Sequence, residues 1–144
     1  VLIERGVHGS DVTPPEPASQ LFDDVPLDSW AAKWATALYE DGYTAGCGTN
    51  PLIFCPWQPI TRAEAAVYFV RMVYGSEYVP PDSRAQIYVD VPLDAWYAAW
   101  VAAAHAADLV IPCEPEPEPR YCPDMPLTRA VAAYMMVQAK DLLP

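Results

Sequence analysis

The sequence predicts an all-α fold made of tandem helix-loop-helix repeats, and three observations lead to this prediction. When the chain is aligned with itself so that Val67 falls on Val1, nearly every segment finds a counterpart. A threonine precedes an apolar helical run twice, at Thr61 and at Thr128. The four cysteines fall into two short-range pairs, one in each copy. We therefore expect duplicated helix pairs joined by disulfide-stapled loops.

The composition excludes several classes of protein. Apolar residues make up 53% of the 144 residues, which is ample for a core. Eight basic against nineteen acidic residues give a net charge of −11, which argues against nucleic acid and anionic membranes as partners. No apolar run reaches the roughly 18 to 20 residues of a membrane-spanning helix, so no membrane insertion is expected. The absence of an initiator Met or a signal peptide predicts that Val1 lies inside a longer protein or at a processed end.

Each pair of cysteines flanks a loop rich in glycine or proline. Of the three pairings that four cysteines permit, Cys47 with Cys55 and Cys113 with Cys122 is the most economical, because the pairs occupy corresponding positions. Disulfides favour an oxidising compartment outside the cytosol. A zinc site is the competing interpretation, but the spacing contains no Cys-x-x-Cys and only two histidines are present. We expect neither metal nor cofactor.

The duplication divides the chain into five segments. The first is the end of a helix from a preceding repeat, which Gly9 terminates as Gly75 terminates the later copy. Two proline-rich linkers without hydrophobic periodicity are expected to run extended over the surface. The segments are 1–10 for the helix end, 11–20 for the first linker, 21–76 for the first complete repeat, 77–86 for the second linker and 87–144 for the second repeat.

The first helix of each complete repeat follows an aspartate. Asp28 and Asp94 are expected to be the N-caps, because a short carboxylate accepts hydrogen bonds from the free N–H groups of the first turn. The helices should run to about Glu40 and about Ala107. Two further aspartates, Asp24 and Asp90, are assigned to caps or turns, since they lack the alternating ligand spacing of a calcium loop.

Each of these helices carries two tryptophans four residues apart, which would share one face. They are Trp30 and Trp34 in the first repeat and Trp96 and Trp100 in the second. Core and inter-repeat packing is the favoured interpretation, and a sugar-stacking platform is the alternative. In the loop that follows, residues 46–51 should form a tight turn, whereas the alternating proline and glutamate of residues 112–122 should project stiffly into solvent.

The second helix of each repeat contains the best functional clue. Thr61 and Glu64 form a predicted capping box, whereas Thr128 has Val131 at the glutamate position and is capped less completely. Arg62 and Arg129 follow the two threonines, in the first turn, where the helix dipole disfavours a cation. Either these arginines bind an anionic ligand, or they reach back to a neighbouring carboxylate.

The two copies carry a set of mostly corresponding residues, which are Phe22, Asp24, Val25, Trp30, Gly46, Phe54, Pro56 and residues 60–64 in one copy, and Tyr88, Asp90, Val91, Trp96, Tyr121, Pro123 and residues 127–130 in the other. This repeated pattern resembles the S-layer homology repeat of bacterial surface proteins over nearly the whole chain. The resemblance implies repeats packed about a pseudo-threefold axis, with cell-wall polysaccharide in the grooves between them. The chain departs from the family pattern at Val131 and Pro112, and it contains only the end of a third repeat.

Carried over to this chain, the resemblance assigns the glycan-binding residues. They are Arg62, Arg129, Trp30, Trp96 and Glu64, and the glycan is expected to carry an acidic pyruvate ketal. A guanidinium suits such a carboxylate because it donates two parallel hydrogen bonds. The implied location is extracellular, at the cell surface.

Two functions follow, and both are non-catalytic. One is a cell-surface anchor that binds cell-wall polysaccharide. The alternative is a structural subunit of a surface layer, filament or envelope complex that contacts other surface-protein subunits, including copies of itself. No enzyme is expected, because the acidic residues fall at caps and in loops and no nucleophile and base are evident. The two functions differ in whether Arg62 and Arg129 face an open groove or are engaged at a protein contact.

Overall fold

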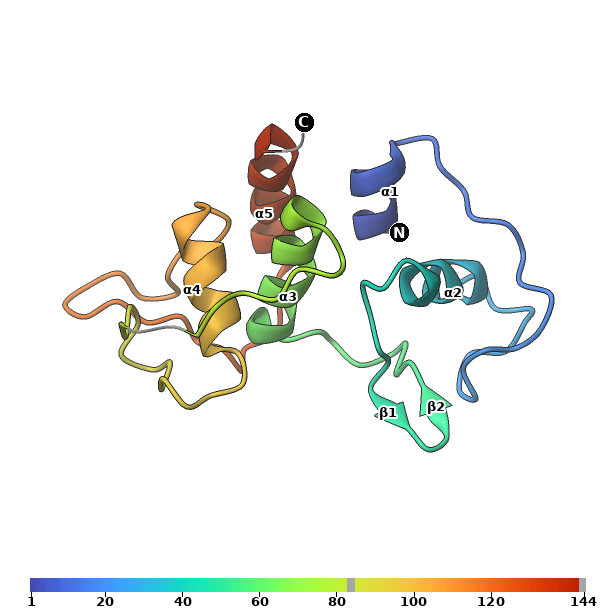
Figure 1. Cartoon of the computed structure of the whole chain (residues 1–144), viewed down its shortest axis with the longest axis horizontal. Helices are drawn as coiled ribbons and strands as arrows, with labels where there is room; N and C mark the ends of the chain where they lie inside the picture. The colour runs from blue at the N-terminus through green and yellow to red at the C-terminus, as the bar shows by residue number, and fades with distance from the viewer. Residues whose placement is uncertain (83–84, 143–144) are drawn as a thin grey trace. The chain divides into compact units, whose positions relative to one another are not determined.

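The computed structural model describes residues 1–82 and 85–142, and the regular secondary structure of this part is almost entirely helical (Figure 1). The elements are α1 (Leu2–His8), α2 (Ala32–Glu40), β1 (Gly48–Thr49), β2 (Leu52–Ile53), α3 (Arg62–Tyr74), α4 (Ala98–Ala106) and α5 (Arg129–Leu142). The predicted all-α class is therefore confirmed. The short antiparallel hairpin of β1 and β2, with Gly48 opposite Ile53, was not predicted and lies inside the first stapled loop. Among the described residues, no helix has the length and apolar character needed to span a bilayer.

The chain forms two compact units, unit 1 (residues 1–58) and unit 2 (residues 59–144). In unit 1, α1 packs against α2; in unit 2, α3 packs against both α4 and α5. Each compact unit thus begins with the second helix of one repeat and continues with the first helix of the next. The repeat boundaries drawn from the duplication, and the pseudo-threefold packing, stay predictions.

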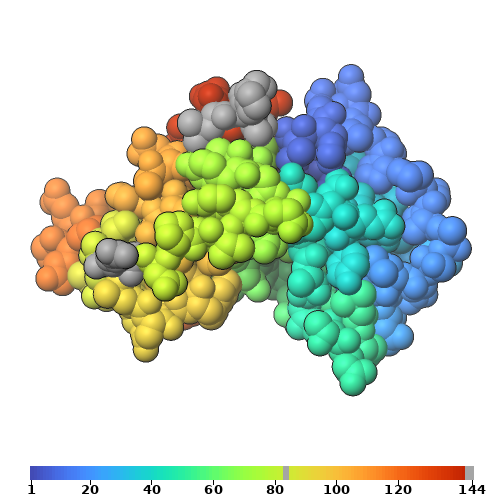
Figure 2. Space-filling view, viewed as in Figure 1, coloured from blue at the N-terminus to red at the C-terminus, as the bar shows by residue number. Residues whose placement is uncertain are grey.

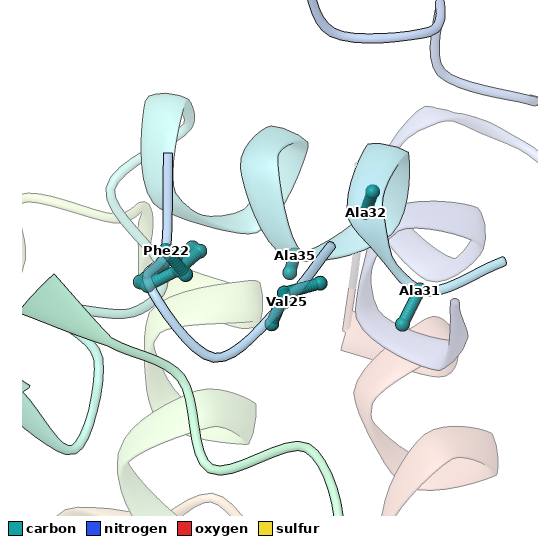
Figure 3. Close-up of a cluster of buried hydrophobic side chains, with 5 residues drawn as sticks. All are labelled: Phe22, Val25, Ala31, Ala32 and Ala35. Atoms are coloured by element: carbon teal, nitrogen blue, oxygen red, sulfur yellow. The ribbon is translucent and has the colours of Figure 1, made fainter. Parts of the chain in front are cut away.

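The core of unit 1 forms where the segment before α2 folds back onto that helix. Figure 3 shows Phe22 and Val25 from this segment beside Ala31, Ala32 and Ala35. The small alanines allow the chain to approach the helix closely, and Phe22 is 1% exposed. Its ring also meets those of Tyr39 and Phe54, with centroids 5.6 and 5.1 Å away. This packing connects the helix to the stapled loop.

One buried residue of unit 1 is charged. Glu4 on α1 is 2% exposed, and its Oε1 atom has no hydrogen-bond partner. Burial chiefly, together with the charge of the Asp41 carboxylate and a hydrogen bond to it, raises the pKa of Glu4 against the attraction of His8.

Unit 2 has a larger core, in which α3 lies beside α4 and α5 (Figure 1). Ala65, Ala66 and Val70 on α3 and Ala104 on α4 are fully buried. Tyr88 precedes α4 as Phe22 precedes α2, and its ring meets those of His105 and Tyr121 at 5.5 and 5.4 Å. The aromatic arrangement of unit 1 is therefore repeated in unit 2 with more polar rings.

The predicted N-caps Asp28 and Asp94 are wrong. The helices begin after Ala31 and Tyr97, and neither of these residues makes a side-chain capping bond. The reason lies in the preceding segments, which form turns in which the N–H groups of Ser29 and Ala95 donate to main-chain carbonyls three residues earlier. Each aspartate lies inside such a turn, so its carboxylate is too far back to cap the helix. The predicted helix ends, near Glu40 and Ala107, are confirmed.

The start of α3 follows its prediction closely. Thr61 Oγ1 accepts a hydrogen bond from the Glu64 N–H, and the Glu64 carboxylate accepts one from the Thr61 N–H, which completes the capping box. At α5, Thr128 Oγ1 accepts from the Val131 N–H at 3.2 Å, and Val131 has no carboxylate to accept a bond in return, so the weaker cap is also confirmed. Gly9 and Gly75 end α1 and α3 with φ angles of 109° and 99°, which a residue with a side chain rarely adopts.

Both predicted disulfides, Cys47–Cys55 and Cys113–Cys122, are present and no cysteine is free. Every residue from Glu114 to Arg120 is exposed, and Figure 2 shows this segment, in orange, projecting from the rest of unit 2. The Cys113 N–H donates to the Arg120 carbonyl, and the Arg120 N–H to that of Glu114, both at 2.8 Å. The loop is therefore closed at its base and acidic at its tip.

Candidate functional site

The beginning of α3 is covered by the segment that follows the second stapled loop. The Arg62 N–H donates to the Met125 carbonyl at 2.9 Å, and the Ala63 N–H donates to the Pro123 carbonyl at 3.0 Å. These two N–H groups have no partner within their own helix, so the segment supplies acceptors that the helix lacks. The first helical turn of one repeat is thereby joined to the loop of the next.

The Arg62 side chain strengthens the same connection. Its Nε donates to the Tyr121 carbonyl at 2.7 Å and its Nη2 to the Ile111 carbonyl at 2.6 Å. The guanidinium also lies 4.8 Å from the centre of the Tyr121 ring, and the Tyr121 hydroxyl donates to the Arg62 carbonyl at 2.6 Å. Arg62 is 6% exposed. Its cation is tolerated in the first turn because main-chain carbonyls, rather than carboxylates, surround it.

Arg129 occupies the corresponding position on α5, in a different environment. It is exposed, and within residues 1–82 and 85–142 no hydrogen bond or ion pair engages its guanidinium. The two copies of the Thr-Arg-Ala motif thus present one buried and one accessible cation. The two copies of the motif, Thr-Arg-Ala in both, did not indicate this difference.

The other predicted glycan residues are accessible to different degrees. Glu64 is exposed, but its carboxylate already has partners. Its Oε2 atom accepts hydrogen bonds from the Thr61 N–H, at 2.6 Å, and from the Thr61 hydroxyl, at 2.9 Å. Trp30 and Trp96 are 67% and 63% exposed, so the preference for core packing is wrong for both. They lie in the turns that precede the helices and therefore do not share a helical face with the partners four residues on. Trp34, inside α2, is 9% exposed, as core packing predicts.

Asp24 and Asp90 have a role that the sequence did not indicate. The two oxygens of Asp24 accept from the N–H groups of Phe54 and Cys55, at 2.8 and 2.7 Å. Those of Asp90 accept from the equivalent N–H groups of unit 2, both at 2.7 Å. Each aspartate therefore holds the second cysteine of its stapled loop in place and does not cap a helix.

A shallow hollow in unit 2 is lined by uncharged residues before and on α4, among them Tyr88, Val91, Leu93 and Val101. None of the five predicted glycan residues lines it. The arrangement as a whole, with helix pairs, aspartate-held disulfide loops and tryptophans open to solvent, defines an extracellular helical repeat module.

Comparison with known proteins shows which extracellular proteins this helical module is similar to. No protein-family model matches the chain. It is 28% identical over 131 residues to the S-layer protein EA1 of Bacillus anthracis and to an S-layer protein of Bacillus licheniformis, a stretch that covers 91% of the chain and 14% of each relative. An S-layer protein of Bacillus thuringiensis subsp. finitimus is 30% identical over 99 residues, or 69% of the chain and 11% of the relative.

These matches confirm the predicted resemblance to the S-layer homology repeats of bacterial surface proteins. They also confirm the predicted extracellular, cell-surface location, and they give the chain a surface-layer-related role. The chain spans 14% of the length of the first two relatives, each of which is named as an S-layer protein and neither as an enzyme.

Proposed function

We propose that the chain is a non-catalytic anchoring module that binds an acidic cell-wall polysaccharide, and that Arg129 makes the main contact with it. The observation that carries this proposal is the contrast between the two arginines. Arg62 is buried against carbonyls, whereas Arg129 is exposed and unengaged among the described residues. Arg129 also lies in the first turn of α5, where the helix dipole favours an anion.

The remaining predicted residues take supporting roles in this proposal. A pyruvate ketal presents a carboxylate that Arg129 can bind with two parallel hydrogen bonds. Trp96, and Trp30 in unit 1, offer exposed ring faces against which sugar rings can stack. Arg62 and Glu64 shape the start of α3 and need not touch the glycan. With a net charge of −11, the chain must recognise such a polymer locally, because its overall field repels it.

Co-sedimentation with purified cell-wall sacculi tests the proposal. The parent chain should be retained on native sacculi and lost from sacculi stripped of polysaccharide. Arg129→Ala should weaken retention about tenfold or more, the value of a charge-assisted hydrogen bond. Lys140→Ala is the matched control, because it removes an exposed cation from the same helix. Equal retention of parent and Arg129→Ala, or of parent on both kinds of sacculi, would contradict glycan binding through this residue.

The environment of Arg62 favours a second candidate, which is assembly with other surface-protein subunits. Since Arg62 binds the carbonyls of a stapled loop, Arg129 is suited to bind an equivalent loop of another repeat. In that case the purified chain should self-associate with increasing concentration in analytical ultracentrifugation, and Arg129→Ala should suppress the association. A chain that stays monomeric and yet binds sacculi through Arg129 would support the anchor alone.

A further inference from the structure

Three side chains capable of binding a metal meet in unit 1, where α1 packs against the end of α2. Glu4 and His8 lie four residues apart on α1, and Asp41 directly follows α2. His8 Nε2 is 2.7 Å from Asp41 Oδ2 and 3.8 Å from Glu4 Oε2. One oxygen from each carboxylate and one imidazole nitrogen all lie within 4.8 Å of one another. A single ring nitrogen therefore faces both carboxylates.

Unit 2 shows that the fold does not require these three residues. The duplication places Val70, Tyr74 and Ala107 at the positions of Glu4, His8 and Asp41. Val70 is fully buried there and simply fills the core. Unit 1 thus has three ligand-type residues where unit 2 has apolar or neutral ones, and Asp41 is distant in sequence from the other two but adjacent to them in space.

Core packing alone does not explain why a charged residue, Glu4, is buried in unit 1. Its position is 2% exposed, and its Oε1 atom has no hydrogen-bond partner. Burying an ionised carboxylate is unfavourable unless a charge and hydrogen bonds compensate for the lost water. Arg5, the adjacent cation, has its Nε directed to the Val12 carbonyl and its guanidinium over the Trp34 ring. A bound cation would supply the charge and the ligand that the carboxylate lacks.

We propose that Glu4, His8 and Asp41 form a binding site for a divalent transition-metal ion, for which zinc is the probe. Two carboxylates and one imidazole are ligands that zinc accepts, whereas calcium and magnesium prefer oxygen alone. Tetrahedral zinc with bonds of about 2.0 to 2.1 Å places its ligands about 3.3 Å apart. The two separations from His8 Nε2, 2.7 and 3.8 Å, bracket this distance, and the two carboxylate oxygens lie within 4.8 Å of each other.

The site would leave at least one coordination position to water. The side chains of His8 and Asp41 are 43% and 38% exposed, so an ion can enter from solvent. The cysteines do not compete, because all four are in disulfides. The proposal departs from the expectation of no metal, which weighed a zinc site made of the cysteines and the two histidines and did not consider this cluster. It is independent of glycan binding, since none of its residues belongs to the predicted glycan set.

Zinc titration of the full chain by isothermal calorimetry tests the proposal, with unit 2 supplying the variants. His8→Tyr, Asp41→Ala and Glu4→Val each install the residue that the other repeat carries, so each is expected to fold. The parent should bind one zinc ion, and each variant should bind it more than about tenfold more weakly, since loss of even an outer partner costs that much. Glu116→Gln, in the acidic loop, is the control for diffuse cation attraction and should bind as the parent does.

A second measurement separates a metal site from a simple ion pair. Zinc should raise the thermal unfolding temperature of the parent and leave that of the variant carrying all three substitutions unchanged. The proposal is overturned if the parent shows no saturable zinc binding. It is also overturned if His8→Tyr and Asp41→Ala bind zinc as tightly as the parent, because the ion would then be held elsewhere.

Discussion

Unit 1 and the corresponding part of unit 2 use the same contacts to build the same helix pair. Arg5 lies over the ring of Trp34 at 5.3 Å, and Arg71 lies over that of Trp100 at 5.2 Å. The aspartate that holds the stapled loop and the edge-to-face ring pair also recur. The units differ at two places: unit 1 buries Glu4 where unit 2 buries Val70, and the tips of the two stapled loops have different sequences. The recurring contacts therefore define the module, and the differing residues are those free to acquire a function.

The largest effect on stability is expected at Arg62 and not at Arg129, although the two arginines occupy corresponding positions. Arg62→Ala should lower the free energy of unfolding by about 3 kcal/mol, because it removes two charge-assisted hydrogen bonds and leaves carbonyls unpaired. Arg129→Ala should change it by less than about 0.5 kcal/mol. Urea denaturation followed by circular dichroism measures both values. Equal losses would mean that Arg129 also has a structural partner.

The second largest loss of stability is expected at the two aspartates that hold the stapled loops, and it should be the same in both units. Asp24→Ala and Asp90→Ala should each cost about 2 kcal/mol, since each leaves two N–H groups of a stapled loop without an acceptor. Asp28→Ala and Asp94→Ala, at the exposed positions that do not cap a helix, are the controls and should be nearly neutral. Chemical denaturation of the four variants side by side checks this order, and a large loss in either control would restore the capping role.

A third prediction makes unit 1 more like unit 2. In the presence of a chelator, Glu4→Val should stabilise the chain by about 1 to 2 kcal/mol, because it replaces a buried carboxylate with the side chain that the fold accepts at Val70. Urea unfolding with and without chelator provides the measurement. Destabilisation under chelator would show that the carboxylate contributes to packing.

The smallest effect makes unit 2 more like unit 1, which has Phe54 at the position of Tyr121. Tyr121→Phe should cost about 1 kcal/mol near neutral pH through loss of the hydrogen bond to the Arg62 carbonyl. Burial raises the pKa of Tyr121 above its ordinary value of about 10.

This raised pKa also gives the prediction a pH dependence. The contribution of the neutral phenol is complete below about pH 10 and is lost as the pH rises from there through the folded-state pKa, because the unfolded chain ionises first. The variant should therefore lose less stability than the parent in urea unfolding on the alkaline side of pH 10. Parallel losses in both proteins would show that the other buried tyrosines, Tyr88 among them, account for the effect.

Local features of this chain could be predicted from the sequence, and contacts between distant segments could not. The capping box joins residues three apart and the disulfides close short loops, so both are visible as patterns. The carbonyl partners of Arg62 lie 59 and 49 residues away, and no periodicity points to a main-chain carbonyl. The repeated motif thus singled out the two arginines and the family resemblance assigned them to glycan binding, while the burial that distinguishes Arg62 from Arg129 required the structure.

The tryptophan prediction failed for a related reason. Whether Trp30 lies on the same helical face as Trp34 depends on where the helix begins, and element boundaries are the least certain part of a pattern-based prediction. Two turns before Ala32 shift that boundary past Trp30 and leave the ring in solvent. The cluster of Glu4, His8 and Asp41 was hidden similarly, because only its first two members share a helical spacing.

The closure of each loop at its base has a practical consequence. Since the disulfide and its aspartate fix the two ends, the exposed residues at the tip of each loop, 49–51 and 114–118, do not have to be compatible with the helices beneath. The two loops already differ in length, with cysteine separations of 8 and 9, and in character, one a small hairpin and the other a run of proline and glutamate. A foreign peptide inserted at the tip should therefore be displayed on the outside of the cell while the module beneath it folds normally.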